Sequence, residues 1–273
     1  MSAANPEIDA KNSSAETGVV RVLSRGLVLL KAFCPRNEPL TNSELSEATG
    51  LPRPTVSRIT ATLMRLGYLE YLPNKTQYRL GSAALTLGFG TLSTMDVRLR
   101  AREHMQRFAE KEDLLVVLSV RDGMVMVCQV VCRGRGALTV RLEVGSRVEL
   151  PHSAMGRAWA ASLSPGEHES FTHEMRRHFA SDKVYELMDE ASVKIRETGF
   201  CTSFSELEPD LMSCATVINL PRTVGPYVLG CAGPAFRYPR DRCDTELGPK
   251  LIALRLRIEE EALSSQPLLH GGI

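Results

Sequence analysis

Basic and hydroxyl side chains follow one another along one short stretch near the N-terminus. The stretch reads LPRPTVSRITATLMRLG from Leu51 to Gly67 and contains no acidic residue. Arginine can donate two hydrogen bonds to a guanine, and serine and threonine can bind bases or phosphates, whereas glutamate would be repelled by the phosphates. This composition favours a surface that binds nucleic acid. The candidate contact residues in it are Arg53, Thr55, Ser57, Arg58 and Thr62.

The spacing of the apolar residues places this stretch on a helix. A predicted buried stripe has the period of a helix and consists of Val56, Ile59, Leu63 and Leu66. Pro52 and Pro54 suit a first turn, where a missing N–H costs nothing, and Gly67 ends the helix. Alone, a polar face opposite such a stripe would be typical of any solvent-exposed helix, so the interpretation depends on the neighbouring elements.

A second helix is predicted immediately before this one. Thr41 and Glu44 have the spacing of a capping box, and Leu40 and Leu45 have that of a hydrophobic staple. Gly50 lies where a left-handed residue is wanted to end the helix. The two helices are therefore joined by a tight turn.

A first helix over Val20–Phe33 and a β-hairpin complete the unit. The hairpin is predicted from YLEYLPNKTQYRL, in which alternating residues flank a Pro-Asn turn and Lys75 lies at the tip. Helix, helix, tight turn, helix and hairpin make a winged helix-turn-helix over residues 19–81. In this motif the helix after the turn enters the major groove, so the predicted partner is double-stranded DNA.

The composition of the whole chain agrees with this reading. Its 273 residues suffice for two modest domains. Residues 21–81 contain nine Lys or Arg and four Asp or Glu, whereas the chain from Ser82 onward contains 23 and 25. Residues 1–18 are predicted to be a disordered tail without a signal pattern. Because no apolar run approaches the ~18 residues of a membrane span, we expect no membrane partner and a cytoplasmic location.

The remainder of the chain is predicted to mix helices with a mostly antiparallel sheet. Residues 82–97 are expected to form a linker helix, and residues 98–273 a second domain. Its expected helices cover 97–112, a short segment capped by Ser153, 183–197 with Gly199 at its end, and 241–263. Its expected strands cover 114–121, 124–132, 137–144, 200–206, 214–220 and 226–232. The fold class is therefore α+β.

Several motifs together resemble the IclR-type bacterial transcription regulators. The N-terminal likeness runs through SRGLVLLKAF and LTNSELSEATGLPRPTVSRITATLMRLGYLEYLPNKTQYRLG. It continues in VGSRVELPHSAMGRAWAA, GFCTSFSELEPDLMSCA and VLGCAGPA, and covers nearly all of the chain after the tail. The resemblance implies a homodimer or a dimer of dimers, paired through the N-terminal and linker regions. It also implies a GAF-like second domain that binds a small metabolite, commonly a carboxylate.

The resemblance also indicates where that metabolite would bind. The implied positions are Ser153, Ala154, Met155, Gly156, Ser203, Ser213, Gly230 and Ala232. Backbone N–H groups at the start of the helix near Met155 could bind an anion, and Gly156 could let a ligand approach closely. Pro151 stands where many relatives have histidine. The Met155–Arg157 triplet resembles the subgroup that controls the breakdown of aromatic acids through the β-ketoadipate pathway.

Metal, cofactor and enzyme chemistry have weaker support. Cys128 and Cys132 would lie ~13 Å apart on one face of a strand, too far for one zinc ion, and we expect no metal, no cofactor and no catalytic residue. No common catalytic motif occurs. Two alternatives stay open, a regulator that senses redox state through thiols and a redox enzyme using Cys201 or Cys214.

Overall fold

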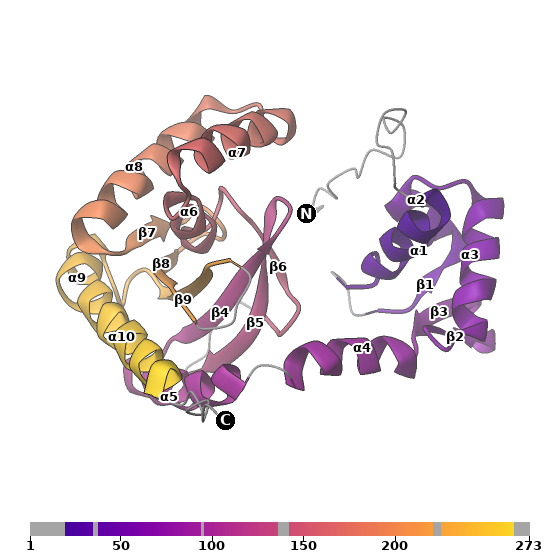
Figure 1. Ribbon diagram of the computed structural model, residues 1–273, viewed down its shortest axis with the longest axis horizontal. Coiled ribbons are helices and arrows are strands. Elements are labelled where there is room, and N and C mark those ends of the chain that lie inside the picture. The colour runs from indigo at the N-terminus through magenta and orange to yellow at the C-terminus, as the bar shows by residue number, and fades with distance from the viewer. Residues whose placement is uncertain (1–19, 35–37, 94–95, 136–141, 221–224, 265–273) are drawn as a thin grey trace, which may run out of the picture. The chain divides into compact units, whose positions relative to one another are not determined.

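The computed structural model describes residues 20–34, 38–93, 96–135, 142–220 and 225–264 (Figure 1). The chain forms two compact units, residues 1–95 and 96–273. Each unit is described below by itself. The predicted α+β class is confirmed, with a helix-turn-helix in the first unit and an antiparallel sheet in the second.

The first unit packs three helices against a small three-stranded sheet. Its elements are α1 (Arg21–Lys31), β1 (Leu40–Thr41), α2 (Asn42–Thr49), α3 (Arg53–Arg65), β2 (Leu69–Leu72), a 3₁₀ turn (Pro73–Lys75), β3 (Gln77–Leu80) and α4 (Ser82–Ser93). The strands lie in the order β1-β3-β2 and all pair antiparallel. The sequence did not reveal β1, a two-residue strand that ties the start of α2 to the hairpin.

Local signals fix the ends of the helices in this unit. The Thr41 hydroxyl accepts a hydrogen bond from the Glu44 N–H, and the Glu44 carboxylate accepts one from the Thr41 N–H at 2.7 Å. Gly50 and Gly67 have φ angles of +67° and +75°, where a side chain would be strained. The tight turn between α2 and α3 therefore follows from residues that the sequence identifies.

The predicted buried stripe of α3 needs correction. Leu66 is 60% exposed, because α3 ends at Arg65 and Leu66 lies beyond it. Thr60, which the prediction did not include, is buried at 1% exposure. On α1, Val22 is 73% exposed and Leu29 is fully buried, and Phe33 reaches the core just after the helix ends at Lys31. The core of this unit is Leu29, Phe33, Leu40, Leu45, Leu51, Val56, Leu63, Leu69 and Tyr78.

The second unit is a six-stranded antiparallel sheet covered on both faces. Its strands are β4 (Leu115–Asp122), β5 (Val125–Arg133), β6 (Arg147–Glu149), β7 (Cys201–Phe204), β8 (Leu211–Ile218) and β9 (Tyr227–Pro234), in the order β6-β5-β4-β9-β8-β7. Its helices are α5 (Asp96–Glu112), α6 (Ala154–Ala161), α7 (Pro165–His178), α8 (Asp182–Thr198), α9 (Arg240–Arg242), a π-helical segment (Cys243–Leu247) and α10 (Gly248–Ser264). Helices α6 to α8 lie on one face, and α5 and α10 on the other (Figure 1).

Three local expectations for this unit differ from the structure. Helix α7 was not predicted, although Ser164 and Glu167 form a capping box at its start. The strand expected over 137–144 lies mostly outside the described residues, and residues 142–144 are not in a strand. The third strand of this region is β6, which pairs with β5.

A β-bulge also changes the placement of two cysteines. The β4–β5 pairing shifts register so that Leu118 faces Val130 but Ser119 faces Cys128, which leaves Gln129 as the extra residue. Cys128 therefore packs in the core beneath α6, whereas the Cys132 thiol contacts the Arg102 carbonyl of α5 at 3.6 Å. The expectation that both lie on one face was wrong because the bulge reverses the alternation.

Candidate functional site

The polar face predicted for α3 is present at the surface of the first unit. Arg53, Ser57, Arg58 and Thr62 are exposed, and Thr55 is half-buried. Pro52 and Pro54 start the helix, and the apolar stripe beneath the face anchors it to the core. A helix held in this way can present its first turns to a groove of DNA without rearranging.

The electrostatics of this face suit a polyanion. Arg53, Arg58 and Lys75 form no ion pair with another residue of the described ranges. Lys75 is exposed in the 3₁₀ turn at the tip of the hairpin, whereas Arg79 further along is paired with Glu70 at 2.6 Å. The unpaired cations are thus available to phosphates, which dominate the affinity for DNA.

One residue that sequence reasoning missed links the parts of this surface. The Asn42 amide lies 3.4 Å from the Ser57 hydroxyl of α3 and 3.5 Å from the Tyr78 hydroxyl of β3. Asn42 follows the Thr41 cap directly, so it lies at the first turn of α2. No sequence signal separates it from an ordinary first-turn residue, because its contacts come from two other elements.

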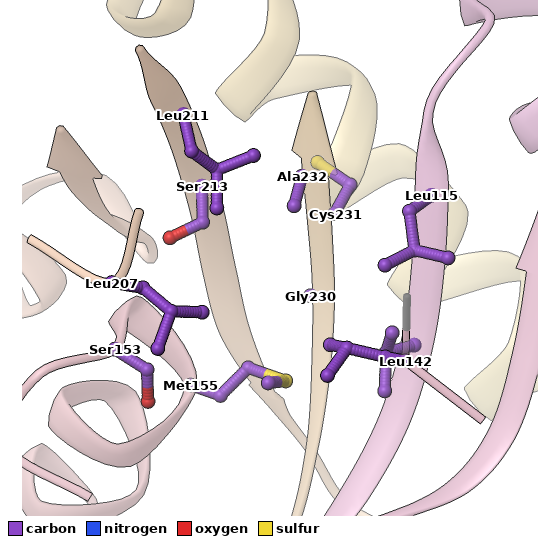
Figure 2. Close-up of a pocket in the computed structure, with 11 residues that line it drawn as sticks. Leu115, Leu142, Ser153, Met155, Leu207, Leu211, Ser213, Gly230, Cys231 and Ala232 are labelled. Atoms are coloured by element: carbon purple, nitrogen blue, oxygen red, sulfur yellow. The ribbon is translucent and has the colours of Figure 1, made fainter. Parts of the chain in front are cut away.

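The second unit contains a pocket between α6 and the sheet (Figure 2). The pocket encloses about 360 Å³ of empty space, part of it open to solvent. Its lining comes from β4, β8, β9, the start of α6 and two loops, and consists of Leu115, Val117, Leu142, Ser153, Met155, Leu207, Leu211, Ser213, Gly230, Cys231 and Ala232. About 20 Å³ of it can be reached by the centre of a water-sized sphere, so the pocket as it stands holds little more than a water molecule and a ligand would have to widen it.

The antiparallel register explains the floor of the pocket. Ser213 faces Ala232 and Ala232 faces Leu115 across three strands, which places them in one row. Gly230 and Val117 face each other in the next row. A β-carbon at Gly230 would lie 2.9 Å from the Met155 side chain, so the glycine makes room for Met155 against the sheet.

The eight positions implied for a metabolite fall into two groups. Ser153, Met155, Ser213, Gly230 and Ala232 line the pocket, whereas Ala154, Gly156 and Ser203 do not. Ser203 is buried beside Ser213 in the same row. Leu115, Val117, Leu142, Leu207, Leu211 and Cys231 are lining residues that sequence reasoning missed.

Gly156 has a packing role in the structure. A β-carbon at Gly156 would overlap the backbone of Leu150, so this glycine permits close packing within the protein. Ala154 is fully buried. The expected Ser153 cap is present, since the Ser153 hydroxyl accepts a hydrogen bond from the Gly156 N–H at 3.1 Å.

The described lining of the pocket is mainly apolar. None of its residues is charged, and its two hydroxyl groups belong to Ser153 and Ser213. The Ser153 hydroxyl already caps α6, and it points away from the pocket in Figure 2. The lining therefore suits an apolar ligand body with one hydrogen bond to Ser213.

A buried ion pair lies beside this pocket. Arg157, on α6, is 2% exposed, and its guanidinium pairs with the carboxylate of Glu206 in the loop after β7. The Arg157 Nε donates a hydrogen bond to the Pro151 carbonyl at 3.0 Å. Burial lowers the pKa of Arg157, although an arginine stays protonated in proteins.

The thiols are poorly suited to redox chemistry. Of the described residues, Cys34 is the one exposed cysteine. Burial raises the pKa of Cys201 to about 12. The pKa of Cys214 is raised well above its ordinary value, mainly by burial and also by a hydrogen bond with Cys231. Because the thiolate is the reactive form, these environments argue against redox chemistry at Cys201 or Cys214.

In the part of the chain that the structure describes, no three metal-binding side chains come together. Within the same ranges, no helix combines the length and apolar character that crossing a bilayer requires.

Comparison with known proteins gives consistent matches across both units. Residues 22–73 match the IclR helix-turn-helix domain, and residues 89–258 match the C-terminal domain of the bacterial transcriptional regulator IclR. The HTH-type transcriptional regulator TsaQ1/TsaQ2 of Comamonas testosteroni is 29% identical over 92% of this chain and 91% of its own length. The Pca regulon regulatory protein of Pseudomonas putida is 27% identical over 77% of this chain and 74% of its own length.

A solved structure extends the likeness to three dimensions. The crystal structure of an IclR family transcriptional regulator from Brucella abortus is 32% identical. It aligns with a TM-score of 0.78 over 93% of this chain and 95% of its own.

Proposed function

Because the chain belongs to the IclR family of bacterial transcription regulators, we propose that it binds operator DNA through α3 and the hairpin under the control of a small carboxylate. The observation that carries the DNA contact is the exposed face of α3, which has three arginines without an ion pair among the described residues and no acidic residue. The proposed contacts are Arg53, Thr55, Ser57, Arg58 and Thr62, with Lys75 on phosphate.

The roles of these residues differ with their position. Residues in the first turns of a recognition helix reach base edges, so Arg53, Ser57 and Arg58 would contribute to sequence specificity. Lys75 at the hairpin tip would contact the backbone, which carries no sequence information. The two kinds of contact predict different mutational signatures.

We propose that the functional form is a homodimer or a dimer of dimers. One winged helix buries too little surface for tight specific binding, so two would bind a pseudo-palindromic site. Apolar side chains on α1 and α4 support this, because Leu23 and Leu27 are 61% and 52% exposed and Leu85 is 74% exposed. Such surfaces are normally covered by a partner. Light scattering that found a tight-binding monomer would contradict the proposal.

The pocket of the second unit is the proposed effector site. Its apolar lining supports a small ligand with an apolar body, and an aromatic acid is the particular candidate. The ligand would alter DNA binding only if it binds the two conformers of the protein with different affinity. Ser213 would donate to a polar group of the ligand.

The proposal is tested by selecting DNA from a random library with the full chain. The affinity for the selected site is then measured against a shuffled site at fixed salt, with and without benzoate, benzamide and short aliphatic carboxylates. We expect a selected site with approximate two-fold symmetry and a change in affinity with a carboxylate but not with its amide. Failure to enrich any sequence would contradict the DNA-binding part, and equal responses to benzoate and benzamide would contradict the carboxylate part.

A further inference from the structure

The pocket lining lacks a cation, and the buried cation beside it already has a carboxylate partner. Arg157 lies one turn beyond Ser153 on α6, and Ser153 is a lining residue. The Arg157 Nε donates a hydrogen bond to the Pro151 carbonyl, so the arginine side chain folds back toward the N-terminal turn of α6. The positive end of the helix dipole and the guanidinium therefore both require a negative group.

Glu206 supplies that negative group from a loop that also forms a wall of the pocket. The loop runs from Ser205 to Asp210, and Leu207, the neighbour of Glu206, lines the pocket (Figure 2). Ser205 and Asp210 have left-handed φ angles of +56° and +57°, and the Ser205 N–H donates to the Leu211 carbonyl at 2.7 Å. The loop is thus closed at its base, and the ion pair holds it to α6.

In a buried ion pair, replacing the carboxylate by another anion costs less free energy than separating the two charges without a replacement. Arginine stays charged, so removing Glu206 alone would leave a buried and uncompensated cation. The negative charge of Glu190 on α8 also raises the pKa of Arg157, but among the described residues Glu190 forms no ion pair with Arg157. The loop can therefore leave α6 at low cost only when another anion takes its place. The Arg157 side chain is 3% exposed and the Glu206 side chain is 21% exposed, so the ion pair is open to solvent on the Glu206 side.

We propose that Glu206 is an exchangeable internal counterion, and that the carboxylate of a bound ligand replaces it on Arg157 and releases the loop of residues 205–210. This inference rests on the proposed carboxylate control and names its mechanism. A ligand with its apolar body in the pocket would put its anion on Arg157 and displace Leu207 together with Glu206. The pocket would thereby detect a negative charge although no charged side chain lines it.

The exchange is tested by removing the internal carboxylate and supplying it from solution. Glu206→Ala deletes a CH₂–COO⁻ group, which acetate replaces. In the full chain we expect this variant to melt roughly 10 °C below wild type. Sodium acetate should recover at least half of that loss with saturation, whereas sodium chloride at equal ionic strength and acetamide should not.

Two control variants isolate the ion pair from other effects of the substitution. Glu208→Ala removes an exposed carboxylate from the same loop, and Arg157→Met/Glu206→Ala removes both charges. Acetate should stabilise neither control more than wild type. If acetate raised the melting temperature of Glu206→Ala no more than that of Glu208→Ala, the proposal would be overturned.

A second variant covers the possibility that Glu206→Ala does not fold. Glu206→Gln keeps the shape of the side chain and loses its charge, so acetate should raise its melting temperature by several degrees more than that of wild type. Equal shifts in the two proteins would overturn the proposal. Because neither titration involves DNA, its outcome is independent of whether the proposed DNA binding is correct.

The tether itself is measured by labelling the loop. In a Cys34→Ser background, Leu207→Cys should react with a thiol reagent several-fold faster when Glu206→Ala is added than when Glu208→Ala is added. Equal rates would show that the ion pair does not hold the loop and would overturn that part of the proposal.

Discussion

The two candidate sites of this regulator are built in opposite ways. The α3 face is a continuous piece of chain with exposed, unpaired cations. The pocket is assembled from three strands, a helix and two loops, and its nearest buried cation is already neutralised. A surface that binds a polyanion needs exposed, unpaired positive charges. A pocket that discriminates between small ligands needs a complementary shape and a buried charge.

This difference predicts that the two sites can be damaged separately. A change that fills the pocket should leave the α3 face intact, and a change on α3 should leave the pocket intact.

Gly230→Leu should abolish the response to ligand. A side chain at position 230 meets Met155 and occupies the pocket, so we expect ligand affinity to fall at least ~100-fold, or about 3 kcal/mol. DNA affinity without ligand should stay within about threefold of wild type. Gly166→Leu is the matched control, because Gly166 is exposed on α7 with open space around it. Calorimetry and DNA titration give the two values, and loss of both activities would break the proposed separation.

The two helix caps should differ in their effect on stability. Ser153→Ala leaves the Gly156 N–H buried and unpaired, which should cost about 2 kcal/mol in the second unit. Thr41→Ala removes a half-exposed cap that water can replace, and should cost about 1 kcal/mol in the first unit. Denaturant unfolding of each variant measures these values. A larger cost for Thr41→Ala would contradict the assigned difference in burial.

Lys75→Ala should weaken binding to every DNA sequence by a similar factor, roughly fivefold at moderate salt. The slope of log affinity against log salt should fall by about 1. Titrations of the selected and shuffled sites over a range of salt concentrations test this. A loss of affinity confined to the selected site would instead indicate that Lys75 contacts a base.

Thiol chemistry should have the smallest effect. A maleimide at neutral pH should modify Cys34 rapidly and leave Cys128, Cys201, Cys214 and Cys243 unmodified in the folded protein, because these four are buried and their thiols have raised pKa values. Mass spectrometry after labelling identifies the modified residues. Modification of Cys201 or Cys214, with loss of DNA binding, would revive the redox-sensing alternative.

The sequence predicts the first unit far better than the second, because the first unit is defined by local signals and the second by contacts between distant segments. Capping boxes, left-handed glycines and helical stripes act over a few residues, so Thr41, Glu44, Gly50 and Gly67 could be assigned in advance. The bulge at Gln129 leaves no such local signal. The bulge places Cys128 on the side of the sheet that faces α6 and Cys132 on the other side. Its position is known only from the pairing of β4 with β5.

The pocket shows the same limit more sharply. Alternation along strands could have suggested Leu115 and Val117, once their pairing with Ala232 and Gly230 was known. Nothing in the sequence relates Arg157 to Glu206, which lie 49 positions apart and meet only through the fold. The resemblance to relatives pointed to five residues that line the pocket, and also to Gly156, whose small size serves the packing against Leu150.

The central claim is that the first turns of α3 read the bases of an operator, and one comparison tests it most directly. The affinities of wild type, Arg58→Ala and Arg65→Ala are measured on the selected site and on a shuffled site at the same salt. Both arginines are exposed on α3, but Arg65 lies in its last turn. We predict that Arg58→Ala loses ~1–3 kcal/mol on the selected site and much less on the shuffled one, whereas Arg65→Ala affects both sites equally. Undiminished specific binding by Arg58→Ala would contradict the assignment of α3 as the helix that reads DNA through its N-terminal turns.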